Sequence, residues 1–190
     1  MIHLPDCWWI TPDINAQDEC ESLLALLDTR FKQGIRAIQF RQTLLNPDAF
    51  NHVYSLFSDF CQKHNIPLMI NGSVSQVIQL NAKGCYLNSE RLMEYSERPL
   101  STDYWVGAYC HNLEELLHAQ KLHLDFVSIS PVKKTLSHPE KTPLGWDAFQ
   151  TLAAQTSLPV YALGGLSLSD KPEALARGGQ GIMGIRFISN

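Results

Sequence analysis

Short runs of β-type apolar residues alternate with amphipathic stretches along the whole chain. The stretch over residues 20–33, for example, places Leu23, Leu27 and Phe31 at helical spacing and is followed by Gly34, a typical helix C-cap. Such alternation is typical of βα units that build a parallel sheet. Eight runs predict strands with seven helices between them, at residues 8–11, 37–41, 67–71, 84–88, 105–110, 126–130, 159–164 and 181–188.

The spacing of these elements favours one closed (βα)8 TIM barrel over an open doubly wound sheet. Residues 1–190 show neither a linker nor a change of composition, so we expect a single domain. Helix starts are predicted at Asn46, which precedes a proline, and at Asn112, where Glu115 would complete a capping box. The last run ends near Asn190, so we expect the closing helix to be missing or truncated, with a flank suited to a second copy of the chain or another domain.

Composition and charge argue against nucleic acids and membranes as partners. The formal net charge is -4 and 18% of residues are charged, so the chain has no basic stripe for a nucleic acid. Five cysteines form no C-x-x-C pair and mostly lie in apolar runs, which predicts reduced core thiols. No basic and then apolar leader opens the sequence, and no apolar run approaches the length of a membrane span. We therefore expect a cytoplasmic protein with no membrane partner.

Polar side chains stand where the predicted strands end, at the edge that carries the chemistry of a barrel. No acidic residue lies at a strand end near Arg41, so the sequence favours an anionic ligand there, and a guanidinium suits phosphate. For His111, an acid–base role and a helix-capping role are equally supported. Asn71 could equally close a turn, and Tyr109 could belong to the core. The candidates at strand ends are Gln39, Arg41, Asn71, Tyr109, His111, Gly184 and Arg186.

A glycine pair and a long loop add to this edge. Gly164 and Gly165 end the seventh predicted strand just before a serine-rich helix start, where backbone N–H groups can approach a phosphate. A turn kept for packing is the alternative. The loop over residues 130–146, SPVKKTLSHPEKTPLGW, is too long and too polar for an ordinary connection, and loops of this kind are usually functional or disordered.

Seven blocks of the chain, in the same order, resemble the motifs of thiamine-phosphate synthase and of its sister family, the thiazole tautomerase TenI. They are GIRAIQFRQ, LMING, GCYLNSE, VGAYCHNLEEL, DFVSISPVKKT, LPVYALGGL and GGQGIMGIRFI. The resemblance implies a single TIM barrel. RLMEYSERPL, SHPEKTPLGW and PVYALGGL are also similar to the barrel domain fused behind a Nudix hydrolase in some bacterial proteins, although this sequence has no Nudix box.

The resemblance implies chemistry on a small phosphorylated heterocycle. The synthase joins an aminopyrimidine diphosphate to a thiazole phosphate with the help of magnesium, while the tautomerase moves a proton on a thiazole carboxylate phosphate without a metal. Gln39, Arg41 and Asn71 keep the synthase residue. His111 matches the acid–base histidine of the tautomerase.

The same resemblance makes loop 130–146 a lid over the substrate. Thr135 and Ser137 match the two threonines of the family lid, and His138 replaces its lysine. The two aspartates that bind magnesium in the family fall on Gly72 and Arg91. No cofactor is therefore certain, and magnesium is expected only if a diphosphate substrate carries it.

Two classes of function stay open. The first is a thiamine-biosynthesis enzyme, a transferase of the synthase type or an isomerase of the tautomerase type. In it, Arg41 and the Gly164–Gly165 turn bind phosphate, and His111 moves a proton or contacts the leaving group. The second is a catalytically silent phosphate-binding or regulatory module, for example an accessory to a Nudix hydrolase partner.

Overall fold

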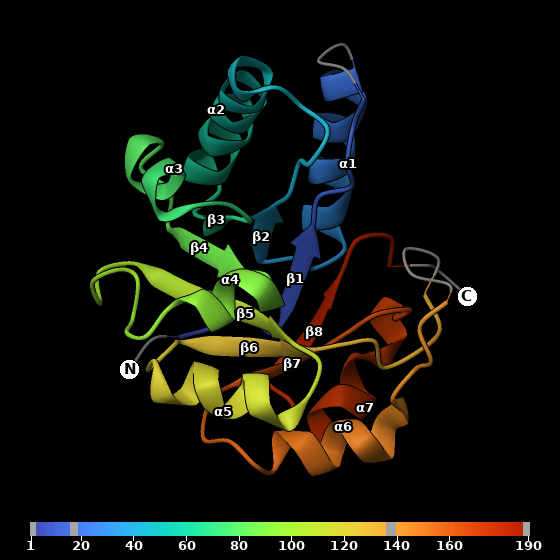
Figure 1. Ribbon diagram of the computed structural model, residues 1–190. Coiled ribbons are helices and arrows are strands. Elements are labelled where there is room, and N and C mark those ends of the chain that lie inside the picture. Colours follow the sequence, from blue (N-terminus) through green and yellow to red (C-terminus); the bar gives the residue numbers. More distant parts are fainter. Residues whose placement is uncertain (1–2, 16–18, 136–139, 188–190) are drawn as a thin grey trace. The chain divides into compact units, whose positions relative to one another are not determined.

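The computed structural model describes residues 3–15, 19–135 and 140–187. Its eight strands run in the order β1 to β8 of a closed parallel barrel, and no helix follows β8 among the described residues, which confirms the predicted fold class (Figure 1). The strands are β1 (Cys7–Ile10), β2 (Ala37–Phe40), β3 (Leu68–Ile70), β4 (Gly84–Leu87), β5 (Trp105–Cys110), β6 (Phe126–Ile129), β7 (Val160–Leu163) and β8 (Gly181–Gly184). The α-helices are α1 (Cys20–Lys32), α2 (Pro47–Lys63), α3 (Val74–Gln79), α4 (Ser89–Glu94), α5 (Leu113–Lys121), α6 (Gly145–Ala153) and α7 (Lys171–Ala176), with a short 3-10 helix η2 (Leu168–Asp170) before α7.

The chain divides into two compact units. Unit 1 is Met1–Cys85, in which α2 and α3 pack on β3, and unit 2 is Tyr86–Asn190, in which α5 packs on β5 and α7 on β8. Nearly every strand residue in both units is buried. Burial on both faces explains why the strands read as continuous apolar runs in the sequence rather than as alternating ones.

Aromatic rings form the core of unit 1. The Phe40 ring lies 5.0 Å from Phe50, 5.5 Å from Tyr54 and 5.3 Å from Phe57, measured between ring centroids. The three partners lie three or four residues apart on α2, so one face of this helix carries them all. Trp9 of β1 joins this cluster, with its ring centroid 6.3 Å from that of Phe57.

Unit 2 has an aromatic core of its own. Tyr86 lies 4.5 Å from Tyr109 and 5.7 Å from Phe126, and Phe126 lies 5.6 Å from Tyr161. Gly107 makes room for the rings, because a Cβ there would stand 2.7 Å from Phe126 and 2.9 Å from Tyr86. Burial raises the pKa of Tyr86 well above its ordinary value. Tyr109 is half-buried against this cluster, which supports its place in the core.

Five helices end in the same backbone motif. After α1, the N–H of Gly34 donates to Phe31 O and that of Ile35 to Arg30 O, which is a Schellman motif around a residue of positive φ. The predicted glycine at the end of this helix is therefore confirmed, one residue past the C-cap. Equivalent pairs of hydrogen bonds surround the other residues at this position, which are Asn65, Asn81, His123 and Gly178.

The two predicted helix starts are also present. The Asn46 side chain accepts from Ala49 N at 2.9 Å, and the Asn112 side chain accepts from Glu115 N at 2.9 Å. The capping box predicted for Asn112 is only half correct. The Glu115 carboxylate accepts the backbone N–H of His111, one residue earlier than expected.

One strand boundary was wrong. The eighth strand was predicted to reach residue 188, which lies outside the described residues, but β8 ends at Gly184, where the Phe187 ring packs on this glycine. A Cβ at Gly184 would lie 2.9 Å from that ring.

The prediction of reduced thiols is confirmed, since the five cysteines are free and buried. No helix in the described part of the chain is long and apolar enough to cross a membrane.

Candidate functional site

His111 follows β5 directly, and loop 130–146 holds its imidazole. Its Nδ1 lies 2.8 Å from the backbone oxygen of Ser130 and 3.4 Å from the Ser130 hydroxyl. Because a carbonyl oxygen only accepts, Nδ1 carries the proton in this contact and Nε2 is left as the nitrogen that exchanges protons. Nε2 has no hydrogen-bond partner among the described residues, so it is available to a ligand.

The Gly164–Gly165 turn packs tightly on one side. Its two residues have φ values of +99° and +68°, which glycine adopts without strain. A Cβ at Gly164 would lie 2.8 Å from the Cα of Pro131, and a Cβ at Gly165 would lie 2.2 Å from the backbone oxygen of Lys134. Close packing against loop 130–146 therefore explains why both residues are glycines, which was the alternative to a phosphate site.

The backbone N–H groups of the same turn lack acceptors among the described residues. The N–H groups of Gly164, Gly165 and Leu166 donate to no backbone or side-chain acceptor among the described residues. Unpaired backbone N–H groups seek an acceptor, and phosphate oxygens are strong acceptors. The packing role and a phosphate-binding role are thus compatible, because the close packing uses none of these N–H groups.

Loop 130–146 is pinned at its base. Val132 N donates to Leu163 O at 2.9 Å and Lys133 N to Gly164 O at 3.0 Å, which joins the loop to the glycine turn. Leu144 N and Gly145 N donate back to the oxygens of Pro131 and Val132, so the two ends of the loop are tied together.

Three lid residues had been predicted to contact the substrate. Thr135 is described and half-buried. Ser137 and His138 lie outside the described residues. Their proposed contacts with a ligand stay predictions.

An ion pair links loop 130–146 to the start of α7. Lys133 Nζ lies 2.6 Å from Asp170 Oδ1, and Asp170 Oδ2 accepts from Ser167 N at 2.8 Å. Burial acts to raise the pKa of Asp170, but the hydrogen bonds from Lys133 and Ser167 outweigh it, so the pKa lies below its ordinary value. The serine-rich helix start is therefore capped by its own carboxylate.

Two further candidates lie around the end of β8. Gly184 is its buried last residue, and Arg186 is exposed two residues later. The tight contact of Gly184 with Phe187 explains the glycine without a ligand. A ligand role for either residue stays a prediction.

In unit 1 the structure corrects the prediction for Arg41. An acidic residue does lie nearby: Asp13, three residues after β1, accepts from Arg41 Nη1 at 2.5 Å. The same carboxylate also accepts from Thr43 N at 2.6 Å. Neighbouring parallel strands bring their carboxyl ends together, so an acid distant in sequence reaches the arginine. Arg41 is therefore neutralised within the protein.

The other two unit 1 candidates belong to β2 and to the position directly after β3. Gln39 is fully buried in β2. Asn71 is half-buried directly after β3, and its N–H donates to Phe40 O at 2.9 Å, which extends the pairing of β2 with β3. Both residues stay predictions as ligand contacts.

The residues present do not fit the magnesium site of the synthase. A Cβ at Gly72 would already lie 2.6 Å from Gln76 Oε1 and 2.8 Å from Ile70, so this position has no room for a carboxylate without rearrangement. Arg91 brings a positive charge to the second position. Asp13, the acid at a unit 1 strand end, is occupied by Arg41 and Thr43. No group of three or more potential metal ligands occurs in the part of the chain that the structure describes.

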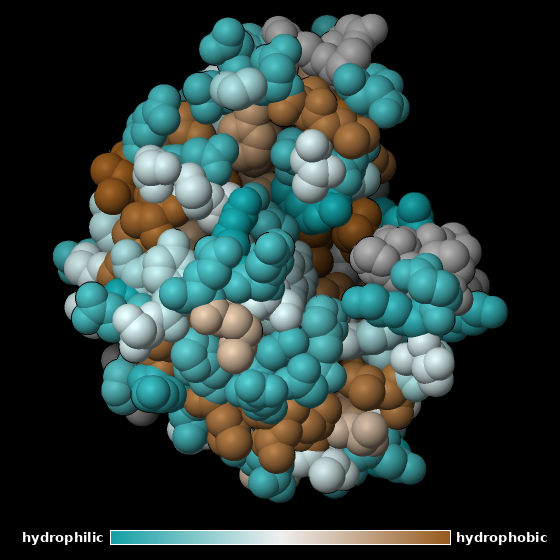
Figure 2. All heavy atoms as spheres, in the orientation of Figure 1, coloured by the Kyte–Doolittle hydropathy of each residue, from teal (hydrophilic) through white to brown (hydrophobic). Residues whose placement is uncertain are grey.

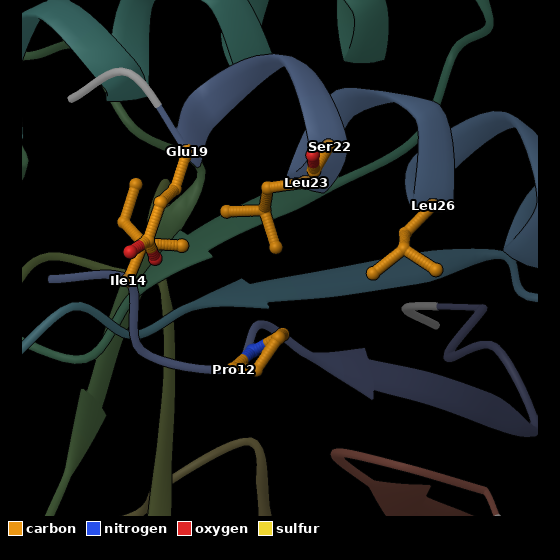
Figure 3. Close-up of a pocket in the computed structure, with 6 residues that line it drawn as sticks. All are labelled: Pro12, Ile14, Glu19, Ser22, Leu23 and Leu26. Carbon is orange, nitrogen blue, oxygen red and sulfur yellow. The ribbon is translucent and has the colours of Figure 1, made fainter. Parts of the chain in front are cut away.

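A groove of about 300 Å³ lies in unit 1, and none of the predicted site residues lines it (Figure 3). Its lining comes from the segment after β1 and from the first turns of α1, and consists of Pro12, Ile14, Glu19, Ser22, Leu23 and Leu26. The lining has one carboxylate, one hydroxyl and no cationic side chain, so it is poorly suited to an anion.

Sequence reasoning missed two acids with partners at strand ends. Asp13 was visible in the stretch W-I-T-P-D, but only the pairing of β1 with β2 shows that it meets Arg41. Asp170 was visible in L-S-L-S-D, but its contact with Lys133 depends on the path of loop 130–146.

Comparison with known proteins finds relatives that are named as thiamine-phosphate synthases. The chain is 28% identical over 165 residues to a putative thiamine-phosphate synthase 2 of Aquifex aeolicus, covering 87% of this chain and 89% of that protein. It is 26% identical over 182 residues to the thiamine-phosphate synthase of Histophilus somni, covering 92% and 82%. A thiamine-phosphate synthase of Synechococcus sp. is 25% identical over 162 residues, and this chain spans 46% of its length.

Solved structures support the fold. A thiamine phosphate pyrophosphorylase from Pyrococcus furiosus matches 95% of this chain and 85% of its own, with a TM-score of 0.76 and 19% identity. The sequence profile described as thiamine monophosphate synthase matches residues 9–188, nearly the whole chain. This chain therefore belongs to the thiamine monophosphate synthase family.

Proposed function

We propose that this chain binds a thiazole phosphate, or a similarly phosphorylated heterocycle, and moves a proton on it. The observation that carries the proposal is the His111 imidazole, whose Nδ1 is held by Ser130 while Nε2 stays unpaired among the described residues. The family membership supports a small phosphorylated heterocycle as the substrate class. A shift of one proton between two atoms of a ring needs one such group and no metal.

In the proposed reaction His111 acts as acid and base in turn. Neutral His111 accepts the substrate proton at Nε2, and the contact of Nδ1–H with Ser130 O stabilises the imidazolium that forms. Nε2 then returns the proton to another atom of the heterocycle, so the protein ends as it began. A positioned acid–base group of this kind accelerates a reaction by roughly 100- to 10,000-fold.

The phosphate group is proposed to bind the backbone N–H groups of Gly164, Gly165 and Leu166. Support comes from their lack of acceptors among the described residues. The remaining candidates are proposed as secondary ligand contacts with no geometry assigned, namely Gln39, Arg41, Asn71, Tyr109, Thr135, Ser137, His138, Gly184 and Arg186. Synthase chemistry would need magnesium delivered with the aminopyrimidine diphosphate, since Gly72 and Arg91 supply no carboxylate.

The second candidate function is a phosphate-binding module without catalysis, of which an accessory to a Nudix hydrolase is one form. The residues at the magnesium positions of the family favour it, because Gly72 has no carboxylate and Arg91 is cationic. A site that keeps its phosphate donors but lacks its metal ligands can still bind the substrate or product of a related enzyme.

Thermal shift and product assays on the same protein separate the two functions. Ligand binding raises the melting temperature in both cases, whereas only an enzyme makes product. We expect thiazole carboxylate phosphate to stabilise the protein and to be converted without added metal. Stabilisation with no conversion, with or without magnesium and aminopyrimidine diphosphate, would establish the binding module instead.

A further inference from the structure

We infer that Glu115 is a positioning residue for His111 and that Ser89 holds Glu115 in place. The inference rests on the proposed proton-transfer role of His111. It starts from the Glu115 carboxylate, which binds the backbone of His111 instead of the helix start that it was predicted to cap.

The Glu115 carboxylate is buried, and both of its oxygens accept hydrogen bonds. Its Oε2 accepts the N–H of His111 at 2.7 Å, and its Oε1 accepts from the Ser89 hydroxyl at 2.7 Å and from Asn112 Nδ2 at 3.0 Å. Glu115 is 9% exposed, and none of these partners is a cation. A buried carboxylate is costly unless hydrogen bonds compensate for its lost hydration, so this arrangement depends on all three donors.

Helix capping alone does not explain the carboxylate. Asn112 already caps α5 by accepting Glu115 N, and Asn88 caps α4 by accepting Arg91 N in the same way. At α2, the third residue after the capping Asn46 is Ala49, so a cap of this type needs no acid there. The carboxylate of Glu115 is therefore additional to the cap, and it connects the start of α4 to the residue that follows β5.

The two contacts fix His111 at two points. Glu115 holds its backbone N–H, and the backbone oxygen of Ser130 holds its ring Nδ1. With both ends held, the direction of Nε2 is determined by the fold and needs no ligand to set it. Removing the carboxylate frees the backbone N–H and lets the ring leave Ser130.

Nitrogen NMR on histidine-labelled protein tests the inference without relying on turnover. The chain has 7 histidines, and the variant His111→Asn assigns the His111 signals. At about pH 8.5, where an imidazole is largely neutral, we expect the two ring nitrogens of wild-type His111 to give widely separated signals, from one protonated and one bare nitrogen. In Glu115→Ala the two signals should move toward each other, because the ring exchanges between tautomers.

Three variants complete the test. Glu115→Gln keeps an oxygen that can accept the His111 N–H, so it should retain the wild-type signals. Ser89→Ala should give signals between those of the wild type and of Glu115→Ala. Asn46→Ala removes a helix cap in unit 1 and should leave the His111 signals unchanged, so it controls for general loss of stability.

Wild-type His111 signals in a folded Glu115→Ala protein would overturn the inference. If Glu115→Ala does not fold, Ser89→Ala decides, and unchanged signals there overturn it equally. Where turnover is measured, we expect Glu115→Ala to lower kcat at least tenfold with little change in KM. Absence of turnover in the wild-type protein would reject the proposed function, but the NMR comparison would still show whether Glu115 positions the His111 ring. The two failures can therefore be told apart.

Discussion

The strand ends of the two units differ in what they leave unpaired. In unit 1 the cation Arg41 is matched by Asp13, which also accepts from Thr43. In unit 2 Lys133 is matched by Asp170, but the Nε2 of His111 and the N–H groups of the glycine turn have no partner among the described residues. A cation at a strand end is therefore a weaker indication of an anion site than an unpaired imidazole nitrogen or backbone amide.

Apolar side chains are exposed on several helices of unit 2. Unit 2 exposes apolar side chains of α4, α5 and α7, Met93, Leu113, Leu117 and Leu175, and Figure 2 shows apolar surface over α5 and α6. None of these side chains belongs to the proposed site. The expectation of a second copy of the chain or of a partner protein stays a prediction.

The largest expected effect comes from Gly165→Ala. Its Cβ would lie 2.2 Å from the backbone oxygen of Lys134, so loop 130–146 would have to move. Gly178→Ala is the matched control, because Gly178 also has a positive φ but nothing within 4 Å of an added Cβ. We expect Gly165→Ala to lower the free energy of unfolding by at least about 2 kcal/mol more than Gly178→Ala, measured by urea unfolding. Equal losses would show that the turn does not depend on this packing.

A smaller effect is expected from Arg41→Ala in unit 1. Because Asp13 already neutralises the guanidinium, its loss should weaken thiazole phosphate binding less than about tenfold, or 1.4 kcal/mol, in a calorimetric titration. Asp13→Asn is the counterpart and should strengthen binding if Arg41 contacts the ligand. Complete loss of binding in a stable Arg41→Ala protein would place the main anion group in unit 1 and reverse the comparison.

The smallest effect concerns Lys133→Met. The pKa of Asp170 lies below its ordinary value, so the pair stabilises the fold above the pKa that Asp has in the unfolded chain, and this contribution is lost as the pH falls through the folded pKa. Lys133 is 44% exposed, so we expect a loss of only about 0.5 kcal/mol at neutral pH and none in strong acid. Lys134→Met is the control and should change stability at neither pH. A loss for Lys133→Met that persists in strong acid would contradict the ion pair.

Local signals predicted most of the fold. The strand runs, the caps at Asn46 and Asn112 and the glycine after α1 depend on neighbours in the sequence, and all are present. The end of β8 was missed because the contact between Gly184 and Phe187 depends on tertiary packing. The expectation of a single domain over residues 1–190 stays a prediction.

The site was harder to predict for a physical reason. Whether Arg41 is free depends on which strand end lies beside it, and Asp13 is 28 residues away in sequence. The Glu115 side chain had two backbone N–H groups within reach, those of Asn112 and His111, and the sequence does not say which it chooses. By contrast, the position of His111 directly after β5 could be predicted from the sequence, whereas its tautomer required the position of Ser130. Its role in proton transfer stays a prediction.

The most direct test of the account compares the turnover of thiazole carboxylate phosphate by the wild type and by His111→Asn. The asparagine amide can still donate to Ser130 O, but it has no nitrogen at the place of Nε2. We predict that turnover falls by at least about 100-fold while the ligand stabilises both proteins equally in a thermal shift assay. Turnover by His111→Asn at the wild-type rate would contradict the account.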